Sequence, residues 1–148
     1  MVRRSNKDEV GAIRALARVA RLLERSSGEL NLAHYRVLSA IAEGDERASR
    51  VADRLTLGKP TVSAAVDSLT KRGLLLREDV ADDRRATTLS LTPAGEDALA
   101  AVDREMLGYL DELLARTPDP AAVLESLGQL GTALDEVAAE RSARRKAK

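Results

Sequence analysis

Apolar residues near the start of the chain recur at intervals of three and four positions. This spacing places them on one side of a helix and predicts a helix over about residues 8–25. Ser26-Ser27-Gly28 marks its end. The apolar positions are Val10, Ile13, Leu16, Ala17, Ala20 and Leu23.

Two shorter helices are expected next. The first is predicted over about residues 32–42, with Asn31 as its N-cap and Gly44 just beyond its end. Ser49 is expected to cap the second, which ends at the tight turn Thr56-Leu57-Gly58.

The helix after this turn, which runs to about Lys71, has two different faces. Val62, Val66 and Leu69 form one apolar stripe, and Gly73 suits the end of the helix. The opposite face is small and polar near the N-terminus and basic near the C-terminus. It comprises Pro60, Ala64, Asp67, Ser68 and Lys71, flanked by Thr61 and Ser63.

A helix of this kind has two interpretations. Its slim outer face, with short hydroxyl side chains at the leading end, suits insertion into the major groove of DNA, where such side chains reach base edges. An ordinary amphipathic helix with a solvated face would show the same pattern. The preceding short helix favours the first interpretation, because two such helices joined by three or four residues form a helix-turn-helix.

After Gly73 the pattern changes to a period of two. Residues 74–77 and 88–92 are expected to form two strands joined by a polar tip. A two-stranded hairpin is marginal alone, so Leu89 and Leu91 must lean on the helices. The predicted fold is mainly α-helical, a winged helix-turn-helix with an antiparallel wing of two or three strands.

Two long helices complete the chain. Thr92 and Pro93 suit the start of a helix over roughly residues 93–116. Residues 117–120 break it, and the basic tail over residues 141–148 is expected to be frayed. The last helix carries an apolar stripe of Val123, Leu124, Leu127, Leu130, Leu134 and Val137.

The outer helices predict a homodimer. Their broad stripes of Leu, Val and Ala exceed what one small monomer covers, so we expect them to pack against a second copy about a two-fold axis. The chain then divides into a helical dimerisation region, residues 1–29 and 93–148, and a winged helix-turn-helix DNA-binding domain, residues 30–92.

Composition narrows the class of protein. The 148 residues include two Tyr, no Phe, no Trp and no Cys, which suits packed helices and excludes disulfides and thiolate metal sites. No apolar run approaches the ~20 residues of a membrane span, and no secretory signal follows Met1. We therefore expect a cytoplasmic protein that does not bind membranes.

The net charge of zero hides a segregation of charge along the chain. Residues 47–77 carry 7 basic and 2 acidic side chains, residues 93–140 carry 2 and 11, and residues 141–148 carry 5 and 0. A neutral protein divided in this way can present one basic face to a polyanion.

No set of residues indicates an enzyme. The chain lacks a nucleophile motif and a phosphate-binding Gly-rich loop, and we expect no cofactor and no metal site. His34, the single histidine, is expected on a helix surface, with a pH-sensitive hydrogen bond near a pocket as the alternative. Tyr35 and Tyr109 are expected in the core or in an interface.

An ordered set of short motifs spans residues 30–95. In this order, although each is weak alone, the motifs resemble the multiple-antibiotic-resistance regulator (MarR) family. They are LNLAHYRVL (30–38), VADRL (51–55), KPTVS (59–63), VDSL (66–69), RGL (72–74), DDRR (82–85) and LSLTPAG (89–95).

The resemblance implies a homodimeric repressor or activator that binds double-stranded DNA at a pseudo-palindromic operator, with recognition helices roughly 34 Å apart. Many members release DNA when they bind a small phenolic or otherwise anionic effector, although the resemblance assigns no effector-binding residues here. Gly58 departs from the family, which usually has Ser there, so the helix has a weaker cap. The alternative function is a winged-helix protein-interaction or scaffold module without an operator.

The candidate DNA contacts lie on the recognition helix, just after it and in the wing. Asp67 either accepts from a cytosine amino group or orients a neighbouring Arg or Lys. In the wing, Asp83 can brace one arginine while another enters the minor groove, and the sequence does not decide which arginine enters. Arg47, Arg50 and Arg54 are either contacts to the DNA backbone or solvated side chains. The candidates are Lys59, Pro60, Thr61, Ser63, Ala64, Asp67, Ser68, Lys71, Arg72, Arg77, Asp83, Arg84 and Arg85.

Overall fold

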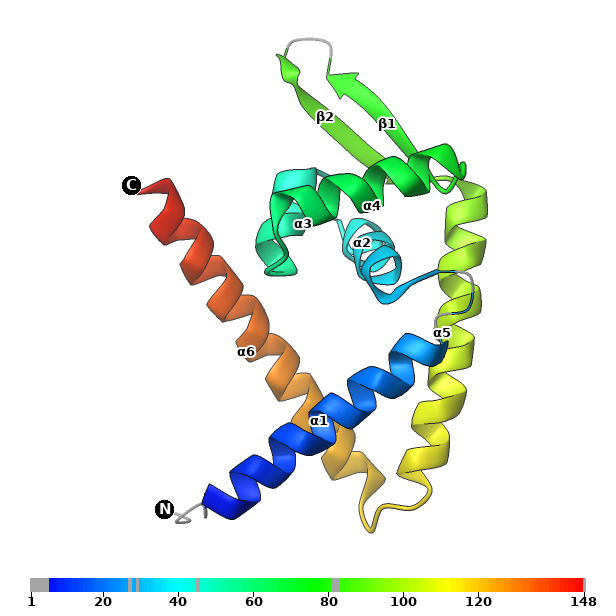
Figure 1. The fold of residues 1–148 in the computed structure, drawn as a ribbon, viewed down its shortest axis with the longest axis vertical. Helices are drawn as coiled ribbons and strands as arrows, with labels where there is room; N and C mark the ends of the chain where they lie inside the picture. Colours follow the sequence, from blue (N-terminus) through cyan, green and yellow to red (C-terminus); the bar gives the residue numbers. More distant parts are fainter. Residues whose placement is uncertain (1–5, 27, 29, 45, 81–82, 148) are drawn as a thin grey trace.

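The computed structural model of the protein describes residues 6–26, 28, 30–44, 46–80 and 83–147. Within these ranges, six helices and one two-stranded antiparallel sheet confirm a mainly helical winged fold (Figure 1). The elements are α1 (Asn6–Ser26), α2 (Leu32–Ala42), α3 (Ala48–Arg54), α4 (Lys59–Lys71), β1 (Leu75–Val80), β2 (Asp83–Leu91), α5 (Pro93–Leu114) and α6 (Pro120–Lys146).

The core lies in the head, which we define as α2, α3, α4, β1 and β2. The predicted stripe of α4 faces inward, since Val62, Val66 and Leu69 are at most 1% exposed. Leu89 anchors the wing to the helices, as expected, and is buried. The other large side chains that are almost fully buried are Val37, Leu38, Val51 and Leu75.

Local capping follows the sequence at two helices. The Asn31 side chain accepts a hydrogen bond from the backbone N–H of His34 at 2.8 Å, and the Thr92 hydroxyl accepts one from Gly95 N–H at 3.0 Å. Both side chains satisfy amides that the first helical turn leaves unpaired. The Thr92 hydroxyl also donates to the Gly73 carbonyl at 2.6 Å, which ties the start of α5 to the end of α4.

The prediction that Ser49 caps α3 is wrong. The N-cap of α3 is Arg47, in an extended conformation and without a side-chain cap hydrogen bond. The preceding Glu46 carbonyl accepts a hydrogen bond from Leu89 N–H at 2.7 Å. This contact with the wing fixes the loop one residue before the N-cap, so the helix starts at Ala48 and Ser49 lies inside it.

The wing is longer than the sequence pattern predicts. Its strands pair from Leu75 opposite Leu91 to Val80 opposite Asp83, whereas the pattern indicated only residues 74–77 and 88–92. The register shifts between Asp79 and Val80 near the tip. Backbone pairing needs no alternating apolar residues, so a polar extension of a hairpin gives no hydrophobic signal.

The C-terminal tail is also different from the prediction, because α6 continues to Lys146 instead of fraying near Arg141. Ser142 donates a hydrogen bond to the Asp53 carboxylate at 2.8 Å, and Arg145 pairs with the same carboxylate. These contacts hold the end of α6 against α3 (Figure 1).

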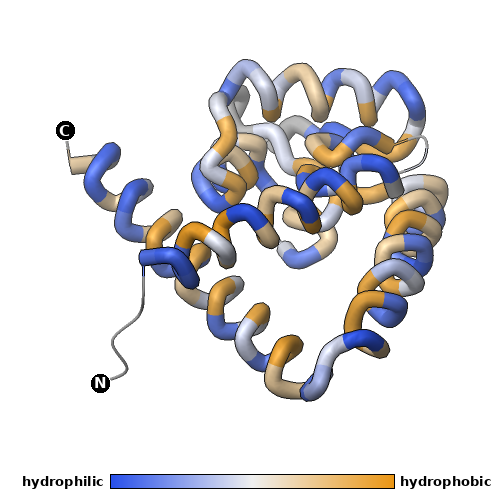
Figure 2. The backbone as a smooth tube through the Cα atoms, turned by 60° about the horizontal axis from the view of Figure 1, so that its bottom comes forward, coloured by the Kyte–Doolittle hydropathy of each residue, from blue (hydrophilic) through white to orange (hydrophobic). Residues whose placement is uncertain are grey.

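The outer helices, α1, α5 and α6, expose much of their apolar surface. Figure 2 shows apolar segments recurring along the helices that lie outside the head. On α1, Ile13 is 66% exposed and Leu16 is 51% exposed; on α6, Leu134 is 69% exposed. Among the described residues, no helix is both long enough and apolar enough to cross a lipid bilayer.

Candidate DNA-binding surface

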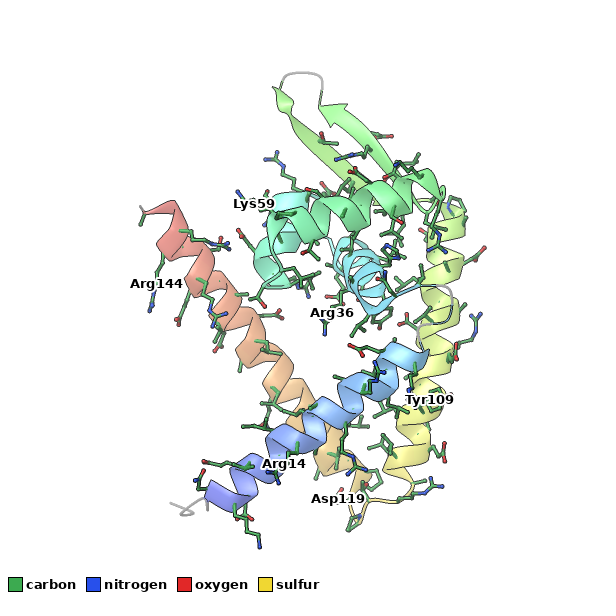
Figure 3. All side chains as sticks on the ribbon, in the orientation of Figure 1. Arg14, Arg36, Lys59, Tyr109, Asp119 and Arg144 are labelled. Carbon is green, nitrogen blue, oxygen red and sulfur yellow. The ribbon has the colours of Figure 1, made fainter. Side chains whose placement is uncertain are left out.

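The candidate surface is the outer face of α4. Lys59, Thr61 and Ser63 are exposed there, as are Pro60 and Ala64, whereas Ser68 is half-buried. Figure 3 shows Lys59 at the leading end of this helix, beside α3. Apart from Lys59, the exposed side chains on the first turns are short, so the helix presents a narrow edge.

The start of α4 lacks a side-chain cap. Gly58 occupies the N-cap position in an extended conformation, and no side chain accepts a hydrogen bond from the first turn. The prediction of a weaker cap at this glycine is therefore confirmed. The leading amides of α4 point out of the helix beside Lys59 and Thr61, where an anionic group can bind.

The C-terminal end of α4 is basic and joins the wing. Lys71 ends the helix, Arg72 is its C-cap, and both are exposed. Arg77 on β1 donates a hydrogen bond to the Asp67 carboxylate, with Nη1 and Oδ1 2.7 Å apart. The structure thus brings these two candidates together. Of the two roles predicted for Asp67, the contact matches the second, in which Asp67 orients a neighbouring arginine.

The Asp67–Arg77 pair links the recognition helix to the wing. Both side chains are about half exposed, 53% and 45%, so the pair contributes little to stability, roughly 0–1 kcal/mol. Its main effect is geometric, since it fixes β1 relative to α4. The pair also neutralises the only acidic side chain on the outer face of the described α4.

The candidates at the tip of the wing have a defined backbone position only. Asp83, Arg84 and Arg85 lie at the start of β2. Their side chains are outside the part of the chain that the structure describes, so which arginine reaches a groove stays a prediction.

The arginines around α3 do not form one group. Arg54 is partly buried and pairs with Glu43 and with Asp135 of α6, the latter at 3.6 Å. Arg47 and Arg50 are exposed. Only these two therefore stay available as backbone contacts from the region before α4.

His34 lies near the end of α4 and is partly buried. Burial lowers its pKa, and the positive charge of Arg72 lowers it further. Its Nδ1 atom is buried without a hydrogen-bond partner among the described residues. Both effects favour the neutral form of the ring. Within the described ranges, no group of three or more potential metal ligands occurs.

Tyr35 connects the head to α5. Its hydroxyl donates a hydrogen bond to the Asp103 carboxylate at 2.9 Å. Burial raises the pKa of Tyr35 to about 12, and the hydrogen bond to Asp103 adds to this effect. The expectation that Tyr35 lies in the core or an interface with its hydroxyl paired is confirmed, whereas Tyr109 is 37% exposed on α5.

The docking of α6 on α3 was missed at the sequence level. A signal is present, because Ala138, Ser142 and Arg145 recur at intervals of four and three on one face of the helix. Ala138 is buried and the other two contact Asp53. The period was overlooked because small and basic residues do not form an apolar stripe.

Comparison with known proteins agrees with this geometry. Residues 28–86, which begin before α2 and end within β2, match the model of the MarR family. Over this region the chain resembles the MarR family of DNA-binding transcriptional regulators. These proteins are regulators and not enzymes.

Individual proteins also resemble the chain over most of its length. The chain is 27% identical over 110 residues to a Thauera aromatica protein provisionally described as a transcriptional regulatory protein for the hcr operon. The match covers 74% of this chain and 66% of that protein, so the chain spans just under two thirds of that protein's length. The repressor CouR bound to a 23-mer DNA duplex is 25% identical, with 82% of this chain and 88% of that chain covered and a TM-score of 0.71. Staphylococcus aureus MarR, in complex with salicylate and kanamycin, shares the fold at 17% identity, with 90% and 92% covered and a TM-score of 0.72.

Proposed function

We propose that this protein is a homodimeric repressor of the MarR type that binds a pseudo-palindromic operator through α4 and the wing. One observation carries the proposal: α4 buries its whole apolar stripe in the head and leaves a narrow polar face with basic residues at both ends. A slim helix exposed in this way fits a major groove. That CouR binds a DNA duplex supports the same function here.

Within this proposal the candidates have separate roles. Thr61, Ser63 and Ala64 on the leading turns contact base edges, with hydroxyl hydrogen bonds and a methyl contact to thymine. Lys71 and Arg72 contact phosphates where the chain leaves the groove. An arginine of the wing enters the minor groove, whose negative potential attracts a guanidinium.

The outer helices supply the dimer in this proposal. The exposed apolar residues of α1, α5 and α6 would be covered by the same helices of a second copy, because a monomer in water leaves them solvated at a cost of about 25 cal/mol per Å². Residues 1–29 and 93–148 then form the dimerisation region, and residues 30–92 bind DNA in the cytoplasm, where the operator lies. The exposed apolar residues include Val10, Ile13, Leu16, Val19, Leu107, Leu113, Leu124, Leu127, Leu130, Leu134 and Val137.

The release of DNA by an effector belongs to the same proposal. A cavity of about 330 Å³ lies between α5 and the loops beside α4, and Arg72 and Glu105 line it. Arg72 is the C-cap of α4, so a small anion bound beside it would act on the end of the recognition helix. The complex of Staphylococcus aureus MarR with salicylate makes salicylate a suitable first probe.

Selection of bound duplexes from a random pool tests the function directly. We expect an enriched inverted repeat whose half-sites are about one DNA turn apart, and binding that weakens steeply with salt. A pool without enrichment, and with weak salt dependence, would instead support a winged-helix module that binds proteins.

A further inference from the structure

The end of α6 is a folded part of the head surface. Ala138 is 4% exposed against the head, the Ser142 hydroxyl donates to Asp53 at 2.8 Å, and Arg145 pairs with the same carboxylate. Asp135, one turn earlier, pairs with Arg54 at 3.6 Å. A helix end held by these contacts keeps its side chains in a fixed place relative to α3.

The end of α6 lies beside the turn that leads into α4, the proposed recognition helix. Arg141, Arg144 and Arg145 line one surface depression together with residues 56–58, the turn between α3 and α4. Gly58 in that turn is the N-cap of α4 and directly precedes Lys59. Figure 3 labels Lys59 at the start of α4 and Arg144 near the end of α6.

The charge of this region is positive. Asp53 forms an ion pair with Arg145. Glu140 is the acidic neighbour of Arg144, with Arg144 Nη2 and Glu140 Oε2 4.0 Å apart. The Arg144 side chain is 84% exposed, so this contact holds it weakly. The cationic residues that line the depression are Arg141, Arg144 and Arg145, and Lys59 follows its Gly58 in the chain. Arg50 lines a neighbouring depression that shares Asp53.

Basic residues near a helix C-terminus also have a local role, because they offset the negative end of the helix dipole. That role needs only exposure to solvent. It does not explain why Ser142 and Arg145 dock the helix end on α3, which brings Arg141 and Arg144 beside the turn that precedes α4.

We propose that Arg141 and Arg144 contact DNA phosphates next to the bases that the leading turns of α4 contact. The end of α6 would then be a second contact with the DNA backbone, and Arg145 a positioning residue that holds it through Asp53. The ligand is the DNA backbone because the basic depression is continuous with the start of α4. This inference rests on the proposed function.

The test measures binding of the selected operator by fluorescence anisotropy at several salt concentrations. We expect Arg144→Ala and Arg141→Ala each to weaken binding about threefold or more and to make the slope of log K against log salt shallower by about one, since each removes one phosphate-neutralising charge. Arg144→Lys should keep most of the affinity, since a phosphate contact needs mainly the charge.

Arg116→Ala is the matched control. Arg116 is an exposed arginine in an i,i+4 pair with Glu112, 3.1 Å apart, and it lies at the turn between α5 and α6, at the opposite end of α6. This variant should bind as the parent does. Ethylation interference gives a second readout, in which Arg144→Ala should lose sensitivity at one or two phosphates per half-site.

The outcomes separate the two claims. If the parent selects an operator but the double variant Arg141→Ala/Arg144→Ala binds it with unchanged affinity and salt slope, the inference about α6 is wrong and the proposed function stands. If the parent binds no duplex, both are wrong.

Discussion

On the outer face of α4, the position of a side chain along the helix decides what it can contact. Ser63 is exposed one turn from the start of α4, and Lys71 is exposed at its end. A short side chain on the leading turns can reach base edges, whereas a long basic side chain at the exit lies beside phosphates. Specificity and affinity should therefore be separable by single substitutions.

Ser63→Ala and Lys71→Ala test this separation. Ser63→Ala should change the preference among operator variants, by up to ~1–3 kcal/mol at one base position, because a specific hydrogen bond is removed. Lys71→Ala should weaken all sequences about equally. The measurement is a panel of single-base operator variants titrated at fixed salt, and the opposite assignment of effects would mean that α4 enters the groove in the reverse direction.

A second residue-scale prediction concerns Tyr35, whose hydroxyl joins α2 to Asp103 of α5. Tyr35→Phe should reduce the free energy of unfolding by roughly 1–2 kcal/mol, since it removes a hydrogen bond to a carboxylate. Urea denaturation at pH 7 measures this loss, which should leave DNA specificity unchanged because Tyr35 lies outside the outer face of α4.

The pH dependence provides an independent check of the same bond. The pKa of Tyr35 is about 12 in the folded protein and about 10 in an unfolded chain, so the folded state favours the protonated phenol. The resulting stabilisation is complete below pH 10 and is lost as the pH rises to about 12. The parent should therefore lose stability more steeply over this interval than Tyr35→Phe, and equal slopes would show that the hydroxyl is not protected.

At the scale of the elements, local signals predicted what local physics determines. The caps at Asn31 and Thr92 and the buried stripe of α4 follow from side chains close in sequence. The predictions of a cap at Ser49 and of a frayed tail were wrong. The start of α3 at Ala48 and the helical tail both depend on partners far away in sequence. Leu89 N–H fixes the loop before α3, and Asp53 holds the end of α6, and neither contact leaves a periodic apolar pattern.

The joint between the wing and α5 has almost no free space. A Cβ atom added at Gly95 would lie 2.0 Å from the Leu74 carbonyl oxygen, which itself accepts a hydrogen bond from Thr92 N–H. Gly95→Ala should therefore displace the start of α5 and cost about 1–3 kcal/mol or more. Gly108→Ala, in the same helix with nothing within 4 Å, should gain about 0.5–1 kcal/mol. Thermal denaturation compares the two, and equal stabilities would contradict the close packing.

The wing should act as a separate DNA-binding element. Arg84→Ala and Arg85→Ala are each expected to weaken operator binding, with a salt slope shallower by roughly one, while the thermal stability stays near that of the parent. If both variants match the parent at every salt concentration, the wing does not contact DNA.

At the scale of the whole molecule, a compact head is joined to long helices that expose their apolar faces. The largest fully buried side chains all lie in the head, whereas Ile13 of α1 and Leu134 of α6 are about two-thirds exposed, 66% and 69%. Covering these faces with a second copy would place two copies of α4 on one side of the dimer. In the proposed dimer, the spacing of the two half-sites would be a property of the dimer and not of either head.

The most direct test of this account changes only that spacing. The selected operator and a version with five base pairs inserted between its half-sites are titrated against the parent protein at the same salt, and the stoichiometry is measured. Because half a DNA turn rotates one half-site to the opposite face of the duplex, we expect specific binding of one dimer to the selected operator and its loss on the inserted version. Equal affinity for both duplexes would contradict a dimer that binds through two recognition helices.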